Sequence, residues 1–452
     1  MVHPLLPRRS FLKLATLATG SSFLPAFASS PAAVPRFPDK DPSWLTTWNS
    51  ALTTLAGNIR VLPRYDQPVL IEGSTYTGIW MECGPNEALV YASLSRYVPA
   101  VEGKPAPLQI ARNGHMAFFA LQRPDGQIPS AIKSTDVGFG QIQMVVPIAA
   151  TAWDTFEMGG RKDEELLTTA YAACSRWDAW LRQYRDTRKT GLVEGFCTYD
   201  TGHDNSPRWA GIPNRCPDSD ARKFPPLPGM PRICPDLSAT VYGARVALAK
   251  MAEALNKHDE AARWKEDAEK IRRLIIEKLY DAQDGAFYDL DTDNKFIRVR
   301  GDLMSRVLGE HVLDLSQPGD KAIFEAVWTW QIHNPKAFWG PYPLSSIAMD
   351  DPAFVRPIPR NSWGGASQAL TALRAPRWMM HYGKQAEMRF MMQQWCEAIR
   401  RHGEFRQQID PLTGVFTQPD PGGYSPCALV YLDFAARLGA AHAAPSHAHP
   451  PA

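Results

Sequence analysis

The chain has 452 residues, a formal net charge of +2 at pH 7, 44% hydrophobic residues and 21% charged residues. This is the composition of an ordinary globular protein that is long enough to bury a large core. The nearly neutral charge gives no reason to expect binding to nucleic acid or to an acidic membrane surface.

The N-terminal 28 residues have the pattern of an export signal. Pro7-Arg-Arg-Ser-Phe-Leu-Lys13 precedes an apolar run from Leu14 to Phe27, which ends at the small-residue cleavage site Ala26-Phe-Ala28. This order is typical of a twin-arginine signal. The apolar run is too short, and too rich in Ser, Thr and Gly, to span a membrane. We therefore expect residues 1–28 to be removed, and the mature protein to be periplasmic or secreted without a membrane attachment.

The rest of the chain divides by composition into a Pro-rich lead at residues 29–42, one domain at residues 43–440 and a disordered tail at residues 441–452. Within the domain, apolar residues recur at helical spacing in about a dozen stretches. The predicted helices span residues 44–59, 87–97, 108–122, 141–158, 163–184, 237–256, 259–279, 302–308, 321–332, 367–381, 384–402 and 424–438.

The loops between these helices are uneven in length. Gly159-Gly160 and Lys257-His258 are short turns within helix pairs, whereas other loops are long and rich in Trp, Pro, Gly and acidic residues. Helices joined as hairpins in this way predict an all-α fold, an (α/α)6 toroid of six helical hairpins with elaborated loops on one face. An α-solenoid would also join helices in hairpins, but the sequence has no fixed repeat period to support one.

One loop gathers the side chains that a sugar-binding site needs. The segment from Tyr199 to Trp209 contains two carboxylates, an amide, a guanidinium and an indole, at Asp200, Asp204, Asn205, Arg208 and Trp209. A pyranose ring presents C–H groups to an aromatic face and hydroxyls to planar polar side chains. Because glycine and proline fix turns on either side of Asp204, the backbone would set its direction. Runs such as Asp-Asn-Ser-Pro are also common in surface turns and helix N-caps.

Residues Gly202-His-Asp-Asn-Ser-Pro-Arg-Trp209 resemble the Gly-Trp-Asp-Asn-Ser-Pro-Arg pattern of glycoside hydrolase family 63 and of the related mannosylglycerate hydrolase-like and trehalase-like enzymes, with His203 in place of Trp. The resemblance covers most of the chain after about residue 75 and includes, in order, residues 192–194, 338–344, 350–354 and 410–414. It implies an (α/α)6 toroid, an inverting hydrolytic reaction and Asp204 as the general acid. We expect no metal ion and no cofactor.

The catalytic base is where this chain departs from the family pattern. The family's base is the Glu of Phe-Tyr-Glu-Tyr-Tyr-Asp-Pro-x-Thr-Gly, and the similar segment from Phe405 to Gly414 has Gln407 in that position. An amide cannot accept a proton from water at neutral pH. Inverting hydrolysis needs a second carboxylate about 6.5–9.5 Å from the acid. We expect Glu404 to supply it; the alternatives are Glu82, Glu87 and Asp410, with Gln407 orienting a water molecule or a sugar hydroxyl.

Aromatic residues outside the helical pattern complete the predicted substrate site. Trp153, Trp177 and Trp264 recur at helical spacing and are predicted to lie in the core. Other tryptophans fall in loops or at helix starts, where an indole can stack on a sugar. Together with the polar candidates, the predicted substrate-binding residues are Trp80, Glu82, Glu87, Asp200, Asn205, Arg208, Trp209, Trp339, Trp363 and Gln407.

The seven cysteines form no CxxC pair, which argues against a zinc cluster and against a dense disulfide framework. Cys216 and Cys234 flank a Pro-rich insert, and we expect any disulfide to join them. An odd number of cysteines leaves at least one thiol unpaired.

Taken together, the sequence predicts an exported, inverting glycoside hydrolase that acts on the α-glycosidic bond of a small glycoside or an oligosaccharide end. Its partner is a carbohydrate substrate, without nucleic acid or membrane, and the sequence does not predict its oligomeric state. Two alternatives stay open. One is a carbohydrate-binding protein that kept the pocket and lost the base, and the other is a sugar lyase on the same toroid, because one fold hosts many chemistries.

Overall fold

The computed structural model describes residues 32–443, except residues 101–102, 360–361 and 420. The predicted export signal lies outside the described residues, as do residues 444–452 of the predicted tail. The helix that ends the described chain reaches Ala443, so it includes the first three residues of that tail.

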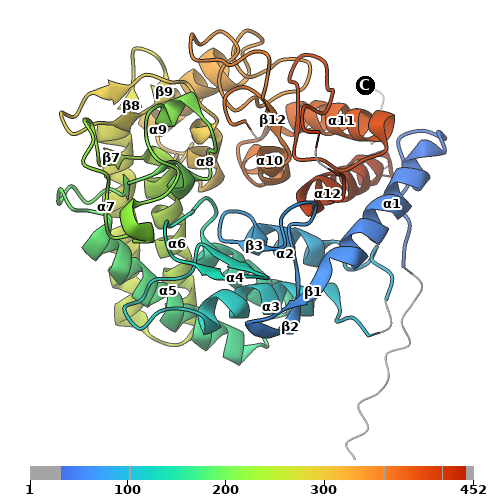
Figure 1. The fold of residues 1–452 in the computed structure, drawn as a ribbon, viewed down its shortest axis with the longest axis horizontal. Coiled ribbons are helices and arrows are strands. Elements are labelled where there is room, and N and C mark those ends of the chain that lie inside the picture. Colours follow the sequence, from blue (N-terminus) through green and yellow to red (C-terminus); the bar gives the residue numbers. More distant parts are fainter. Residues whose placement is uncertain (1–31, 101–102, 360–361, 420, 444–452) are drawn as a thin grey trace, which may run out of the picture. The chain divides into compact units, whose positions relative to one another are not determined.

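An inner ring of six helices surrounds the centre of the described domain (Figure 1). They are α2 Gly84–Ser93, α4 Ile148–Met158, α6 Pro235–Ala254, α8 Leu303–Gly309, α10 Ala369–His381 and α12 Ser425–Ala443. Each contacts the next, and α12 contacts α2, so the ring closes. Most residues of α4 and α6 are buried, as expected for helices that are packed on more than one side.

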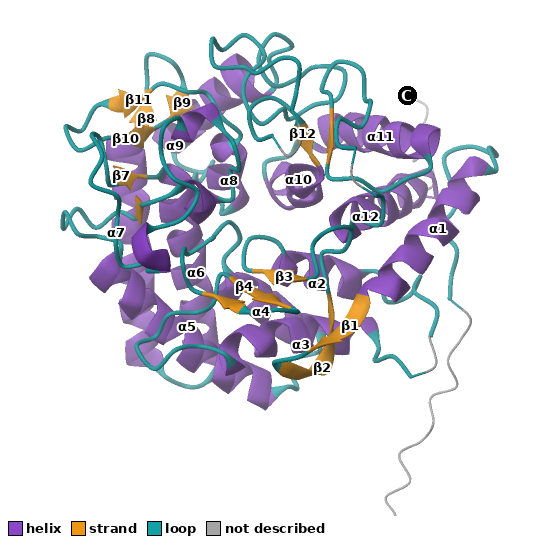
Figure 2. Cartoon of the chain, in the orientation of Figure 1, coloured by secondary structure: helices purple, strands orange, loops and turns teal. Residues whose placement is uncertain are grey.

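Outer helices surround this ring (Figure 2). They are α1 Ser43–Asn58, α3 Pro107–Ala120, α5 Glu164–Tyr184, α7 His258–Leu279, α9 Pro318–Ala326 and α11 Gln385–His402, and a π-helical segment, η4 Val327–Ile332, continues α9. Five of them, α1, α3, α5, α7 and α11, contact the helices of the ring directly. These helices are amphipathic: α7 buries one stripe, formed by Ala261, Ala268, Ile271, Ile275 and Leu279. The alternation of inner and outer helices confirms the predicted (α/α)6 toroid.

The predicted helix starts lie within three residues of the observed ones except for one, and proline explains that difference and one of the smaller ones. The helix predicted from residue 141 starts at Ile148, directly after Pro147, because a residue that precedes proline is disfavoured in the helical conformation. The helix predicted from residue 87 starts at Gly84, with Pro85 in its first turn, where proline is well tolerated. Residues 141–147 are therefore free to form part of the site.

Short strands in the long loops pair with one another through backbone hydrogen bonds. They are β1 Ile59–Leu62, β2 Tyr65–Leu70, β3 Gly78–Trp80, β4 Ala131–Lys133, β5 Val137–Gly138, β6 Glu194–Gly195, β7 Arg232–Ile233, β8 Tyr280–Asp281, β9 Ala286–Phe287, β10 Asp289–Leu290, β11 Phe296–Ile297, β12 Ser367–Gln368 and β13 Gln408–Ile409. The antiparallel sheet β3-β4-β5 joins segments more than 50 residues apart, and β12 pairs with β13. These pairings bring the loops of distant hairpins to one site.

The expected disulfide between Cys216 and Cys234 is not formed, and all seven cysteines are free thiols. The Cys216 Sγ lies 3.6 Å from the Sγ of Cys197 instead. Backbone hydrogen bonds from Thr198 and Tyr199 to residues 213 and 214 draw the start of the Pro-rich loop back towards Cys197.

Within the described residues, no helix combines the length and the apolar character that a membrane span requires.

Candidate active site

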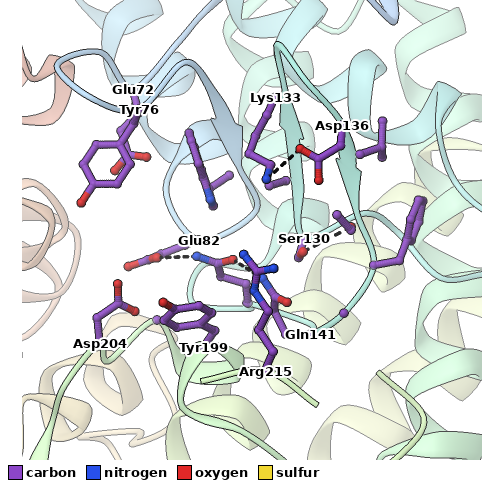
Figure 3. A pocket seen from close by; sticks show the side chains of 18 of the residues that line it. Glu72, Tyr76, Glu82, Ser130, Lys133, Asp136, Gln141, Tyr199, Asp204 and Arg215 are labelled. Carbon is purple, nitrogen blue, oxygen red and sulfur yellow. Dashed lines mark hydrogen bonds and ion pairs between the residues drawn. The ribbon is translucent and has the colours of Figure 1, made fainter. Parts of the chain in front are cut away.

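A cavity of about 440 Å³ collects side chains from distant loops (Figure 3). Asp204 lines it, together with four other predicted residues, which are Trp80, Glu82, Trp363 and Gln407. The lining also includes Glu72, Tyr76, Gln143 and Tyr199, which the sequence did not single out. Carboxylates, amides and aromatic rings in a space of this size suit a small glycoside.

The backbone around Asp204 is fixed on both sides. The 3-10 helix η1 Thr198–Thr201 ends at Gly202, whose φ of +63° is in the left-handed region that favours glycine. On the other side, the amide of Trp363 donates a 3.0 Å hydrogen bond to the carbonyl of Asp204. The Asp204 side chain is half-buried and faces the cavity, so its direction follows from the turn, as the sequence predicted.

His203, next to the candidate acid, is a buried and neutral anchor. Burial lowers the pKa of His203 to about 4. Its Nε2 lies 2.6 Å from Asp302 Oδ1, while its Nδ1 lies 3.0 Å from Nη1 of Arg208. A neutral ring that accepts from the guanidinium at Nδ1 carries its proton on Nε2 and donates it to Asp302. The ring also meets the Trp363 indole edge to face, at 5.1 Å.

Arg208 does not line the cavity; its ion pairs attach the loop to neighbouring elements. Its guanidinium is buried and donates to Asp236 at 2.7 and 2.8 Å and to Asp289 at 2.6 Å through each of two nitrogens. Burial raises the pKa of Asp236, but the Arg208 guanidinium outweighs it and lowers that pKa to about 2. The cation therefore joins the short helix η2 Pro207–Trp209 to the start of α6 and to β10.

Three further residues of the predicted set also lie outside the cavity lining. Asp200 is fully buried, forms an ion pair with Arg185 and accepts from the amide of Ile142 at 2.9 Å. Trp209 is buried and donates to Thr201 Oγ1 at 2.9 Å. Asn205 is exposed, with a φ of +56°. Asp200 and Trp209 therefore hold in place the segment from Tyr199 to Trp209, which we call the acid loop.

Glu82 belongs to the same wall of the cavity as the acid loop. A Cβ atom placed on Gly202 would lie 2.5–2.8 Å from the three atoms of the Glu82 carboxyl group. Gln143 donates to Glu82 Oε2 at 3.1 Å. Burial raises the pKa of Glu82, and the nearby Arg374 opposes this shift. This carboxyl group is thus held close to the turn that carries Asp204.

Glu72 lies on another wall of the cavity, where it contacts the start of α12. The hydroxyl of Tyr424 donates to Glu72 Oε1 at 2.8 Å, and the amide of Ser425 donates to its carbonyl at 2.8 Å. Burial raises the pKa of Glu72 well above its usual range, and the carboxylates of Glu87 and Glu82 add to the shift. Figure 3 shows Glu72 and Asp204 well apart, with Glu82 between them in this view.

Gln407 reaches the cavity, but Glu404 does not line it. Gln407 Oε1 accepts from the Tyr76 hydroxyl at 3.0 Å and from Gln418 Nε2 at 2.9 Å. The Glu404 side chain is 48% exposed and pairs with Arg406 at 2.5 Å. The turn at Gly403 ends α11 before this residue and directs it to solvent, away from the position in which we expected a base.

Two other predicted residues, Asp410 and Trp339, contact other parts of the protein and do not line the cavity. Asp410 accepts from the amides of Leu412 and Thr413, at 2.8 and 3.2 Å, and so organises its turn. Trp339 packs against Trp328, His333 and Phe390, and is not among the residues that line the cavity.

Three buried clusters in the described chain bring together side chains of types that bind metals. Arg185 fills the cluster of Cys197, Asp200 and Cys216, and Arg208 fills that of Cys234, Asp236 and Asp289. The third consists of Glu72, Cys83 and Glu87. Burial raises the pKa of Glu87 to about 7 and raises that of Glu72 well above its usual range.

Sequence reasoning missed most of the polar and aromatic residues of the lining, among them Tyr76, Gln143, Glu72 and Tyr199. Tyr76 precedes the Gly78–Trp80 segment by two residues, so this proximity was a usable signal. Gln143 was hidden inside a predicted helix, and Glu72 and Tyr199 carry no pattern that sets them apart. Their placement depends on pairings across hundreds of residues, such as that of Glu72 with Tyr424.

Comparisons with known proteins agree with the fold. Residues 97–425 match the mannosylglycerate hydrolase MGH1-like glycoside hydrolase domain. The mannosylglycerate hydrolase of Thermus thermophilus in complex with glucose superimposes with a TM-score of 0.63 and 19% identity, covering 85% of this chain and 99% of that one. The neutral trehalase of Saccharomyces cerevisiae gives 0.62 and 14%, covering 84% and 78%.

A rhamnosidase of family 78 from Bacillus sp. GL1 gives a TM-score of 0.58 at 14% identity, covering 91% of this chain and 36% of that one. The curated proteins contain no match. The structural likenesses, at these identities, establish the toroid. Because the domain match extends over most of the sequence, this chain belongs to the MGH1-like glycoside hydrolase family and is a glycoside hydrolase.

Proposed function

We propose that this protein is an exported glycosidase that hydrolyses the α-glycosidic bond of a small glycoside with inversion at the anomeric carbon. The observation that carries the proposal is the entry of Asp204, on a fixed turn, into a cavity that also contains the carboxyl groups of Glu72 and Glu82. Trp80 and Trp363 supply aromatic faces in the same space. An acid, a second carboxylate and stacking surfaces are what inverting hydrolysis requires.

In the proposed reaction, Asp204 donates its proton to the glycosidic oxygen as the bond to the anomeric carbon breaks. A water molecule on the opposite face of the sugar attacks the same carbon and gives its proton to a second carboxylate. An α-glycoside then yields a β-configured sugar. The α configuration of the substrate follows from the family resemblance.

The basic side chains of the cavity lining favour a leaving group with negative charge. They are Arg123, Lys133 and Arg215, of which Lys133 contacts the exposed acid Asp136 at 2.8 Å. The neighbouring Thermus thermophilus enzyme has been crystallised with D-glycerate. We expect mannosylglycerate to be hydrolysed at least tenfold faster than its uncharged glycerol counterpart. Equal rates would contradict an acidic leaving group.

Export rests on the sequence of residues 7–28. Cell fractionation of a bacterium that expresses the full chain should find the protein outside the cytoplasm. Replacing Arg8 and Arg9 together by lysine should retain it inside, and unchanged export of that variant would contradict the twin-arginine route.

The test of the acid is Asp204→Asn, assayed on mannosylglycerate, trehalose and aryl α-mannosides and α-glucosides. We expect kcat to fall by about 10²–10⁴-fold, because general acid catalysis contributes about that much. Glu404→Gln is the matched control, since that side chain is exposed and outside the cavity. Full activity of Asp204→Asn would refute the proposal.

A carbohydrate-binding protein without turnover is the second candidate, and the amide at Gln407 favours it. In that case calorimetry would detect binding of one of these glycosides, while no sugar would be released over days. Any enzymatic release that Asp204→Asn abolishes decides against it.

A further inference from the structure

The family position for the base holds an amide in this chain, yet hydrolysis by inversion needs a carboxylate across the sugar from the acid. We infer that Glu72 is the general base of this enzyme and takes the place of the missing carboxylate at Gln407. The inference rests on the proposed function, which it extends to the second catalytic residue. It assigns a role to a residue that precedes the matched domain region.

Glu82 lies on the same side of the cavity as the acid, which makes it unsuitable as the base. The acid and the base of an inverting enzyme must face opposite sides of the sugar ring, with a water molecule between base and sugar. Glu82 packs directly against Gly202, two residues before Asp204. Its carboxyl group also accepts from Gln143 and is neighboured by Arg374. These contacts suit a group that binds a sugar hydroxyl.

Glu72 lies close to Gln407, the residue at the family's position for the base, in the same wall of the cavity. Tyr424 donates to Glu72, while Tyr76 donates to Gln407. The two tyrosine rings lie 6.0 Å apart, so the two hydrogen bonds are neighbours. Glu72 and Gln407 both line the cavity that Asp204 enters. A carboxylate from the segment after β2 is therefore available where the chain after α11 supplies only an amide.

Burial and the neighbouring carboxylates favour the protonated form of Glu72, so it acts as a base in the molecules in which it is ionised. In that form it accepts a proton from water more strongly than an ordinary carboxylate does. The Tyr424 hydroxyl stabilises the charged form and fixes its direction.

The reaction balances with these two groups and water. The water oxygen forms a bond to the anomeric carbon and loses one proton to Glu72. The bond from that carbon to the glycosidic oxygen breaks, and the leaving oxygen receives the Asp204 proton. After release of both products, Glu72 returns a proton to solvent and Asp204 regains one.

Glycosyl fluorides separate the acid from the base, because fluoride leaves without protonation. The substrates are α-mannosyl and α-glucosyl fluoride, beside the glycoside that the wild type hydrolyses. Asp204→Asn should lose the glycoside but keep fluoride hydrolysis within tenfold. Glu72→Gln should lose both by at least 100-fold, with the melting temperature and calorimetric binding of the glycoside retained. Wild-type fluoride hydrolysis by a folded Glu72→Gln variant would overturn the inference.

A second variant tests the shared wall. Adding Gln407→Glu to Glu72→Gln restores a carboxylate at the family position, so we expect at least a tenfold recovery of fluoride hydrolysis over the single variant. A double variant as inactive as the single would contradict the exchange of roles. If Glu82→Gln, and not Glu72→Gln, abolished fluoride hydrolysis, Glu82 would be the base. If the wild type hydrolysed neither glycosides nor fluorides, the proposed function itself would fail.

Discussion

Gly202 connects the conformation of the acid loop to its chemistry. Its φ of +63° disfavours any side chain, and a Cβ there would collide with the carboxyl group of Glu82. We predict that Gly202→Ala loses about 1–2 kcal/mol of folding stability, the cost of a left-handed residue, and at least tenfold in kcat/KM. Chemical denaturation and steady-state kinetics measure the two effects.

Gly211, in the same loop, is the matched control for this prediction. Its φ is +78°, but no atom lies within 4 Å of a Cβ placed there. Gly211→Ala should therefore lose similar stability and retain kcat/KM. Equal activity of the two variants would show that the contact between Gly202 and Glu82 has no part in catalysis.

The residues of the acid loop show how far sequence reasoning reaches at this scale. The turn residues around Asp204 predicted that the backbone would set its direction, and the structure places it in the cavity lining. Asp200, Arg208 and Trp209 were predicted to contact sugar, yet they bind Arg185, Asp236 and Asp289, and Thr201. Residue type and local spacing do not reveal partners 81 positions away, as Asp289 is from Arg208.

Among the elements, the ion pairs of Arg208 connect η2, α6 and β10. Replacing this residue by methionine would leave Asp236 and Asp289 buried without their cation. We predict that Arg208→Met costs about 3–5 kcal/mol in the free energy of unfolding, as expected when one partner of a buried ion pair is removed. Urea denaturation measures it.

Arg222→Met is the control, because this arginine is 45% exposed and pairs with Asp220 at the surface. Exposed pairs contribute at most about 1 kcal/mol. If the two variants lost equal stability, the buried network would not be what holds the acid loop.

Helix positions were predicted well because a hydrophobic stripe with a 3.6-residue period needs only local sequence. The stripe of α7 is an example. The predicted start of α4 is wrong because residues 142–146 are mostly apolar, and Pro147, not a loss of periodicity, ends the loop. Most of the short strands escaped prediction, since segments of two or three residues such as β12 and β13 are defined by their partners.

For the whole molecule, closure of the ring by α12 and α2 decides which loops meet. It brings Tyr424 to Glu72, 352 positions away in sequence. The sequence indicated six hairpins, and so the toroid, but not which side chains would share the cavity. This is why Glu404 was favoured as the base and Glu72 was overlooked.

The free energy of unfolding should depend on pH through the buried carboxyl group of Glu310, which directly follows α8. Burial raises its pKa from 4.5 to about 7. Between these values the folded protein binds more protons than the unfolded chain, so stability falls as pH rises through this interval. We predict that wild type loses on the order of 3 kcal/mol relative to Glu310→Gln between pH 4 and pH 8. A difference that is constant with pH would contradict this.

The proposed mechanism is tested most directly by the anomeric configuration of the sugar that is released first. Proton NMR, recorded during hydrolysis of an α-glycoside, measures this configuration. Inverting hydrolysis with Asp204 as the acid and Glu72 as the base, as we propose, predicts that the β-anomer appears first and then mutarotates. Release of the α-anomer first would show retention and would contradict the account.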